Sequence, residues 1–214
     1  MKRIAIQGDI GSFHDIAAHE YFKGEQIELI CCETFEEIFK QMKRDPTVIG
    51  MMAIENTIAG SLLHNYELLQ ASGAVIVGEA KLHIQHCICC LPEDDWTTLK
   101  EVHSHPVALA QCRHFLEAHP DLKAVEAADT AGSAEYIANH HLTGMSAICS
   151  SYAARLYHLK VLQNDIHDNK HNFTRFLIIS PSAKADDLRS IADSNKSSVV
   201  FSLPHEEGSL SRVL

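Results

Sequence analysis

Short apolar segments alternate with amphipathic segments along the N-terminal part of the chain, and this alternation constrains the fold most. Residues 2–7, 27–32 and 48–54 have the composition of strands. The segments between and after them (12–22, the residues after Thr34, and 62–71) have helical periodicity. The run 48–54 is apolar throughout, which is typical of a strand covered on both faces. The order strand–helix, three times repeated, predicts an open α/β lobe.

A second set of alternating elements follows and predicts a second α/β lobe. Residues 74–77 and 84–91 are predicted strands on either side of Gly78, which we interpret as a crossover. Three strand–helix pairs come next, at 102–118, 123–140 and 145–157. Residues 174–180 form a strand that returns to the first lobe. The sequence thus predicts two α/β lobes with a cleft between them, followed by a polar linker and a new strand at 197–203.

Composition excludes several classes of function. The 214 residues carry a formal charge of −10, which argues against non-specific binding to nucleic acid or to an anionic membrane surface. No apolar run approaches the roughly 20 residues of a membrane helix, and the N-terminus has no signal-peptide core. Seven cysteines without a secretion signal indicate reduced thiols and a cytoplasmic protein. Cys87 and Cys90 have C-x-x-C spacing, but their apolar surroundings favour a buried strand over zinc or redox chemistry. No metal-binding motif is present.

Polar loops that follow predicted strands form the candidate site. Four of the five loops open a helix, so their backbone N–H groups could bind an anion at a helix N-terminus. The ligand crevice of an open α/β sheet lies at the carboxyl ends of its strands, where these loops gather. The alternative interpretation is that their side chains only cap helices. The loops are residues 11–14, 55–61, 104–106, 129–131 and 150–151.

A last candidate is the segment from His171 to Phe176, where the second lobe returns the chain to the first. Arg175 could bind a carboxylate through both guanidinium nitrogens, and Thr174 could donate a hydrogen bond to a leaving hydroxyl. In the alternative interpretation, Thr174 and Arg175 merely alternate with phenylalanines on a pleated strand.

Five ordered motifs resemble those of the prephenate dehydratase family across nearly the whole chain. They are GDIGSFHDIAA (8–18), AIENTIAGSL (53–62), SHPVALAQC (104–112), DTAGSA (129–134) and NFTRF (172–176). The tail from Ser197 is similar to the first strand, loop and helix start of an ACT regulatory domain. The resemblance divides the chain into a catalytic region (1–182), a linker (183–196) and a truncated ACT domain (197–214). Within the catalytic region, lobe one comprises about 1–77 and 173–182, and lobe two about 78–172. The implied architecture is that of type II periplasmic binding proteins.

The resemblance implies loss of CO2 and hydroxide from prephenate to give phenylpyruvate, a lyase reaction in phenylalanine biosynthesis that needs no cofactor or metal. By the same resemblance, Thr174 is the catalytic hydrogen-bond donor. Arogenate dehydration and a non-catalytic anion sensor remain alternatives. The residues implied to bind substrate are Arg175, Asn56, Thr57, Ser61, Ser12, His105, Thr130 and Phe176.

Regulation is implied only in part. Gly208, Ser209 and Leu210 resemble a segment that binds phenylalanine as an allosteric effector in the ACT domain of this family. Because so few residues follow Ser197, we expect these 214 residues to lack normal phenylalanine inhibition. A homodimer or homotetramer is also implied. The chain departs from the family pattern at Asp9, where the family has proline, and at His14, where it has serine.

Overall fold

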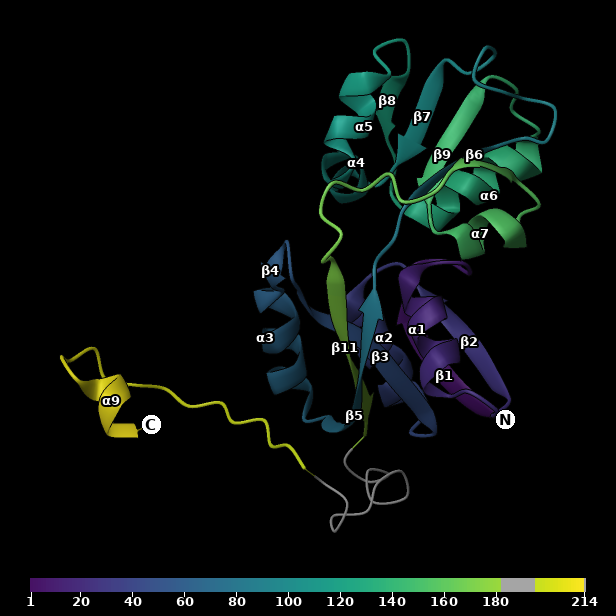
Figure 1. Ribbon diagram of the computed structural model, residues 1–214. Coiled ribbons are helices and arrows are strands. Elements are labelled where there is room, and N and C mark those ends of the chain that lie inside the picture. The colour runs from purple at the N-terminus through teal and green to yellow at the C-terminus, as the bar shows by residue number, and fades with distance from the viewer. Residues whose placement is uncertain (182–194, 214) are drawn as a thin grey trace.

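The computed structural model describes residues 1–181 and 195–213 and contains two mixed sheets, each with helices on both faces (Figure 1). This confirms the predicted α/β architecture with two lobes. The first lobe contains sheet β2-β1-β3-β11-β5 with the short strand β4 paired to β3, and the second contains sheet β10-β6-β9-β7-β8. In the part of the chain described, no helix is both long and apolar enough to cross a bilayer.

In the first sheet, β1, β2 and β3 are parallel, and β11 lies antiparallel between β3 and β5. Apolar residues alternate between two cores because both faces of these strands are covered. Helix α1 packs over one face, and α2 and α3 pack over the other. The elements are β1 (Lys2–Gln7), α1 (Phe13–Tyr21), β2 (Ile27–Cys32), α2 (Phe35–Arg44), β3 (Val48–Asn56), β4 (Gly60–Ser61), α3 (Leu63–Ser72), β5 (Val75–His83) and β11 (Phe173–Ser180).

The second sheet is enclosed in the same way. Helices α6 and α7 pack on one face, and α4 and α5 pack on the other. Its elements are β6 (Cys87–Cys90), β7 (Glu101–Ser104), α4 (Pro106–Gln111), α5 (Arg113–Ala118), β8 (Lys123–Glu126), α6 (Thr130–His140), β9 (Met145–Cys149), α7 (Ser151–Leu156) and β10 (Lys160–Gln163).

Strand β5 is longer than the sequence predicted. Gly78 was interpreted as a crossover, but β5 continues through it to His83, so residues 78–83 belong to the first lobe. The glycine has a packing role, because a Cβ at this position would lie 2.0 Å from the Tyr21 hydroxyl oxygen. The crossover therefore follows His83.

Two adjacent segments connect the lobes. Residues 84–86 lead into the second lobe and residues 164–172 lead back. The Ile84 amide donates to the Asn172 carbonyl at 2.8 Å, and the Ile166 amide donates to the His86 carbonyl at 3.1 Å. These hydrogen bonds join the two connections side by side.

The C-terminal segment differs from the prediction. Residues 197–203 pair with no strand among the described residues, so the predicted new strand is absent there. Helix α9 (Ser209–Val213) follows, and Figure 1 shows it apart from both lobes. Most of the predicted linker, residues 183–194, lies outside the described residues. The fold of an ACT domain is thus not seen in this segment.

Candidate functional site

The two lobes contact each other where several helices begin. A Cβ built at Gly11, just before α1, would lie 3.3 Å from the Cβ of Ala153 in α7 and 3.4 Å from that of Ala131 in α6. The Ser150 hydroxyl donates to the Gly11 carbonyl at 3.4 Å, and the Tyr157 hydroxyl donates to the Ile10 carbonyl at 2.6 Å. The N-termini of α1, α6 and α7 therefore converge between the lobes, as the polar loops predicted.

Two of the predicted side chains cap helices, Ser12 at α1 and His105 at α4. Ser12 Oγ accepts from the Asp15 amide at 3.3 Å, and His105 Nδ1 accepts from the Val107 amide at 3.2 Å. Ser12 is buried and His105 is half-buried. Thr130 is the first residue of α6, directly after its capping residue. The capping alternative thus describes Ser12 and His105 in this structure, while their contact with a ligand stays a prediction.

An acidic pair marks the same contact. Asp129 caps α6, with Oδ1 accepting from the Gly132 amide at 2.7 Å. A Cβ at Gly132 would lie 3.0 Å from Asp9 Oδ2, and one at Gly8 would lie 3.2 Å from Asp129 Oδ2. The two carboxylates therefore approach each other across the lobes. Burial raises the pKa of Asp129, and the nearby charge of Asp9 raises it further.

Thr174 is bound to Asn56 on the neighbouring strand. The two residues are register partners in β11 and β3, and Asn56 Nδ2 donates to Thr174 Oγ1 at 2.9 Å. Asn56 Oδ1 accepts from the amides of Ile58 and Ala59, both at 2.9 Å. Because Thr174 Oγ1 receives this bond, its own hydroxyl hydrogen is left to donate to another group. Two of the predicted residues are thus joined directly.

The hydrogen bonds continue from Asn56 to the second lobe. Asn56 Nδ2 also donates to Asn172 Oδ1 at 2.8 Å, and Asn172 Nδ2 donates to Gln111 Oε1 at 2.9 Å. Gln111 Oε1 lies 3.0 Å from His86 Nε2. Asn172 and Gln111 lie in the NFTRF and SHPVALAQC motifs, but the sequence assigned them no role, since a hydrogen bond between distant segments leaves no local signal.

Arg175 points to the other face of the sheet from Thr174, as alternation along a strand requires. Its Nε and NH2 groups donate to Glu79 Oε2 at 2.9 Å, and NH1 donates to Glu55 Oε2 at 3.3 Å. The Tyr66 hydroxyl donates to Glu55 at 2.5 Å and, together with Arg175, lowers the pKa of that carboxyl. Arg175 is thus ion-paired in this structure, and its contact with a substrate carboxylate stays a prediction.

The remaining predicted residues fall in three different places. Thr57 Oγ1 donates to the His171 carbonyl at 2.8 Å and accepts from the Phe173 amide at 2.9 Å, which ties the turn after β3 to β11. Ser61 is exposed in β4. Phe176 is 1% exposed in the core beneath α1, so packing is the role that the structure gives it. Gly208, Ser209 and Leu210 lie around the start of α9 and do not join the site.

His14 neither caps a helix nor faces solvent. It is buried between α1 and the first sheet, with its ring 4.9 Å from that of Phe176 in an edge-on arrangement. Burial lowers the pKa of His14 to about 3. The imidazole is therefore neutral near pH 7 and belongs to the core.

The cysteines of the C-x-x-C segment are buried, as predicted for an apolar strand. Cys87, Cys89 and Cys90 are all in β6, and each is at most 2% exposed. Cys89 Sγ lies 3.4 Å from Cys149 Sγ on β9, and all seven thiols are free. Among the described residues, no group of histidines, cysteines and carboxylates has the arrangement of a metal site.

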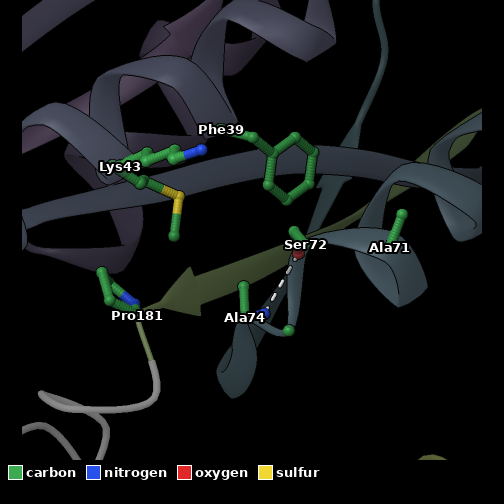
Figure 2. A pocket seen from close by; sticks show the side chains of 8 residues that line it. Phe39, Lys43, Ala71, Ser72, Ala74 and Pro181 are labelled. Atoms are coloured by element: carbon green, nitrogen blue, oxygen red, sulfur yellow. Dashed lines mark hydrogen bonds between the residues drawn. The ribbon is translucent and has the colours of Figure 1, made fainter.

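A cavity of about 390 Å³ lies far from the strand ends described above. Figure 2 shows Phe39 and Lys43 of α2 on one side and residues 71–74, at the end of α3, on the other. Pro181, which follows β11, completes the described lining. Among the described residues that line it, Lys43 is the one charged side chain, which is fewer than two carboxylates of a substrate would need.

Comparison with known proteins now decides the family. A family model described as prephenate dehydratase matches residues 4–184. The chain belongs to the prephenate dehydratase family. This confirms the resemblance that the motifs carried for the region comprising both lobes.

Curated relatives in the family include plant and bacterial proteins. The chain is 39% identical over 214 residues to arogenate dehydratase 2 of Petunia hybrida, covering 99% of this chain and 52% of that protein. It is 33% identical over 183 residues to the bifunctional chorismate mutase/prephenate dehydratase of Escherichia coli (strain K12), covering 85% of this chain and 47% of that protein. The chain thus spans about half the length of these two relatives.

Solved structures have the same fold. A prephenate dehydratase from Arthrobacter aurescens in complex with L-Phe has a TM-score of 0.75 at 25% identity, covering 83% of this chain and 60% of that one. GqqA, described as a novel type of quorum quenching acylase, has a TM-score of 0.76 at 27% identity, covering 98% of this chain and 74% of that one. These two structures, which have similar folds, are therefore described with different activities.

Proposed function

We propose that this chain contains the catalytic region of a prephenate dehydratase, with Thr174 as the catalytic hydrogen-bond donor. In the reaction, the bond to the ring carboxylate breaks and releases CO2. The bonding electrons enter the ring, which becomes aromatic as the C–O bond of the leaving hydroxyl breaks. The departing oxygen takes up a proton to form water, and phenylpyruvate remains. Aromatisation drives the step, so the protein has to orient the substrate and assist the leaving oxygen.

The hydrogen bond from Asn56 Nδ2 to Thr174 Oγ1 is the observation that carries this proposal. It occupies a lone pair of the hydroxyl and leaves the Thr174 hydrogen to donate. Two backbone amides fix the orientation of the Asn56 side chain. The Thr174 hydroxyl is therefore positioned before the substrate binds. A neutral hydroxyl is a weak acid, so we assign it hydrogen-bond assistance and not complete proton transfer.

Other predicted residues complete the proposed site. Ser12 and Thr130 lie where the N-termini of α1 and α6 converge, His105 caps α4, and Thr57 lies beside the Asn56 turn. Backbone N–H groups at such termini favour carboxylates, which compensates locally for the net negative charge of the chain. We keep Ser61 and Arg175 as candidates for the rim of the site.

The test compares Thr174→Val, which is nearly isosteric but has no hydroxyl, with Thr174→Ser, which keeps one. Following phenylpyruvate by ultraviolet absorbance, we expect Thr174→Val to lose 100-fold or more in kcat, on the order of a catalytic donor's contribution. Thr174→Ser should stay within about tenfold of wild type, because the donor is retained. Equal kcat values for wild type and Thr174→Val would exclude the assigned role.

Arogenate is the second candidate substrate, because the Petunia relative is named an arogenate dehydratase. Arogenate carries an ammonium group where prephenate has a keto oxygen, so its product would be phenylalanine. A competition assay with both acids, in which the two products are separated, gives the ratio of kcat/KM for the two substrates.

An acylase function, as described for GqqA, finds less support. Acyl transfer by a threonine needs a neighbouring general base to activate the hydroxyl. The described hydrogen-bond partner of Thr174 Oγ1 is an amide N–H, which donates and cannot accept the hydroxyl proton. We therefore favour the dehydratase, and absence of acylase turnover is the expected result.

For regulation, we propose that residues 197–214 begin an ACT region whose effector is phenylalanine. The support is the sequence resemblance at Gly208, Ser209 and Leu210. Calorimetric titration of these 214 residues with phenylalanine, alongside the turnover assay, tests whether this segment is sufficient for regulation. We expect neither binding nor inhibition, since residues 197–213 contain one short helix and no packed core.

A further inference from the structure

The hydrogen bonds between Asn56 and His86 cross from one lobe to the other. Asn56 lies at the end of β3 in the first lobe, Asn172 and His86 lie in the two connections, and Gln111 ends α4 in the second lobe. We propose that His86 is a positioning residue for the Thr174 hydroxyl, acting through Gln111, Asn172 and Asn56. The inference rests on the proposed function, because it assigns His86 a role in that reaction.

The orientation of each amide in this series follows from the backbone. The amides of Ile58 and Ala59 both donate to Asn56 Oδ1, so Asn56 has to present its Nδ2 to Thr174 and Asn172. An amide nitrogen can only donate. Asn172 therefore faces Asn56 with its oxygen, and its own nitrogen is turned toward Gln111.

The same reasoning fixes the protonation of His86. Asn172 is fully buried, and its Nδ2 donates to Gln111 Oε1 at 2.9 Å. Gln111 thus presents an oxygen to His86 Nε2 at 3.0 Å. Two acceptors cannot bond to each other, so Nε2 has to carry the imidazole hydrogen. Nδ1 is then the unprotonated nitrogen.

The surroundings of the His86 ring agree with this tautomer. Within the described residues, buried Nδ1 has no hydrogen-bond partner, so no acceptor requires the hydrogen at that nitrogen. Burial lowers the pKa of His86 to about 4, so the ring is neutral near pH 7. The Phe13 ring packs edge-on against it at 5.4 Å. The His86 amide also donates to His167 Nδ1 at 3.3 Å, which restrains the backbone.

The series is therefore held at both ends, by the turn amides at Asn56 and by the Nε2 hydrogen of His86. Without that hydrogen, Gln111 Oε1 keeps only the Asn172 donor, and only the turn amides at Asn56 still oppose a rotation of Gln111 that brings its nitrogen to face Asn172. Asn172 would turn in response and present a nitrogen to Asn56 Nδ2. Two donors would then face each other, and Asn56 would be displaced from Thr174 Oγ1. The catalytic hydroxyl would lose its fixed orientation, while the helix N-termini proposed to bind the substrate carboxylates stay in place.

Two variants separate positioning from packing. In His86→Gln, the side-chain nitrogen reaches the place of imidazole Nε2, whereas in His86→Asn it reaches only the place of Nδ1. We expect His86→Asn to lower kcat about tenfold, as for a lost buried hydrogen bond, with KM within twofold of wild type. His86→Gln should recover most of kcat. In a Gln111→Met background, His86→Asn should have no further effect, because the series is already broken.

A measurement on the wild-type chain needs no variant. Nitrogen-15 NMR of the histidine rings distinguishes the two neutral tautomers, and we expect the Nε2–H form for His86. Observation of the Nδ1–H form would overturn the proposal, as would equal kcat losses in His86→Asn and His86→Gln at matched unfolding midpoints. Wild type without turnover of prephenate or arogenate would overturn the proposed function and the positioning role with it. If wild type is active but His86→Asn and His86→Gln lose kcat equally, the positioning role alone is overturned.

Discussion

His14 Nε2 accepts a hydrogen bond from the Ala53 amide at 3.3 Å, across the packed face between α1 and β3. The Ala53 carbonyl in turn accepts from Asn65 Nδ2 at 2.7 Å. The pairing of β3 with β11 shifts register between Arg175 and Phe176, opposite this point. Two side chains therefore satisfy the polar groups of Ala53 where the strand ladder is irregular.

The burial of His14 makes stability depend on pH. Its pKa is lowered to about 3 in the folded chain, whereas the unfolded chain takes up a proton near 6.5. The stabilising neutral form is complete above about pH 6.5, and stability is lost as pH falls toward 3. Between pH 7 and pH 5 we expect the free energy of unfolding to fall by about 2 kcal/mol more in wild type than in His14→Gln. Urea unfolding at both pH values measures this.

A surface histidine supplies the control for that experiment. His205 is exposed in the C-terminal segment, so His205→Gln is the matched histidine substitution away from the packed lobes. His86 and His167 also have lowered pKa values through burial, so the His14→Gln chain should keep a residual dependence of the same sign. Identical pH profiles for wild type and His14→Gln would contradict a buried neutral His14.

Asn65 should be more important for stability than its place on a helix suggests. It is 2% exposed and supplies the amide that satisfies the Ala53 carbonyl. Asn65→Leu would leave that oxygen buried without this donor, at a cost of about 1–3 kcal/mol. Asn139→Leu at an exposed position of α6 should cost under about 0.5 kcal/mol. Denaturant midpoints of the two variants would have to coincide for the prediction to fail.

Arg175 and Thr174 are neighbours, but their substitution should have different effects. Because Glu55 and Glu79 hold the guanidinium on the face opposite Thr174, we expect Arg175→Met to change kcat by less than about threefold. The side chain is 40% exposed, so the ion pairs should contribute no more than about 1 kcal/mol to stability. Steady-state kinetics measure both kcat and KM. A large rise in KM alone would show instead that Arg175 turns to bind a substrate carboxylate.

The acidic pair between the lobes should be destabilising near neutral pH. Asp9→Asn removes one of two approaching carboxylates, so we expect its thermal midpoint to rise by a few degrees at low salt. The pKa of Asp129 is raised in the folded chain, so wild-type stability should increase as pH falls through that range, and less so in Asp9→Asn. Asp121→Asn, an exposed acidic residue of the second lobe, is the matched control. A lower midpoint for Asp9→Asn would mean that the carboxylate has a partner.

Much of the fold could be predicted from local patterns, and particular residues show where such patterns end. The apolar run at 48–54 predicted a strand covered on both faces, and β3 is one. The interpretation of Gly78 as a crossover is wrong, because the sequence alone does not distinguish a glycine that ends a strand from one that leaves room for the Tyr21 hydroxyl. Residues 197–203 have the composition of a strand, but no neighbouring strand pairs with them in the described structure.

The sequence predicted which loops form the site, but not which side chains bond to one another within it. Polar residues after strands indicated which helix N-termini meet, and the lobe contact at Gly11 agrees. The opposite facing of Thr174 and Arg175 follows from alternation alone. The carboxylates that hold Arg175, however, come from β3 and β5, and only the strand register brings them together. Gln111 meets Asn172 across 61 positions, for which one sequence provides no signal.

The position of β11 has a consequence for how the chain acquires its structure. It is the last strand of the first sheet in sequence, yet it lies between β3 and β5. During synthesis, the first sheet cannot be completed until the entire second lobe and β11 have been made. Until then β3 and β5 each have an unpaired edge. Such edges are prone to pair with other chains. In topology, the second lobe is also an insertion between β5 and β11, which pair as the two strands of a hairpin. His83 and Phe173 are register partners at the ends of these strands. If the second lobe folds early, it brings His83 and Phe173 together. The first sheet then stays incomplete for a shorter time.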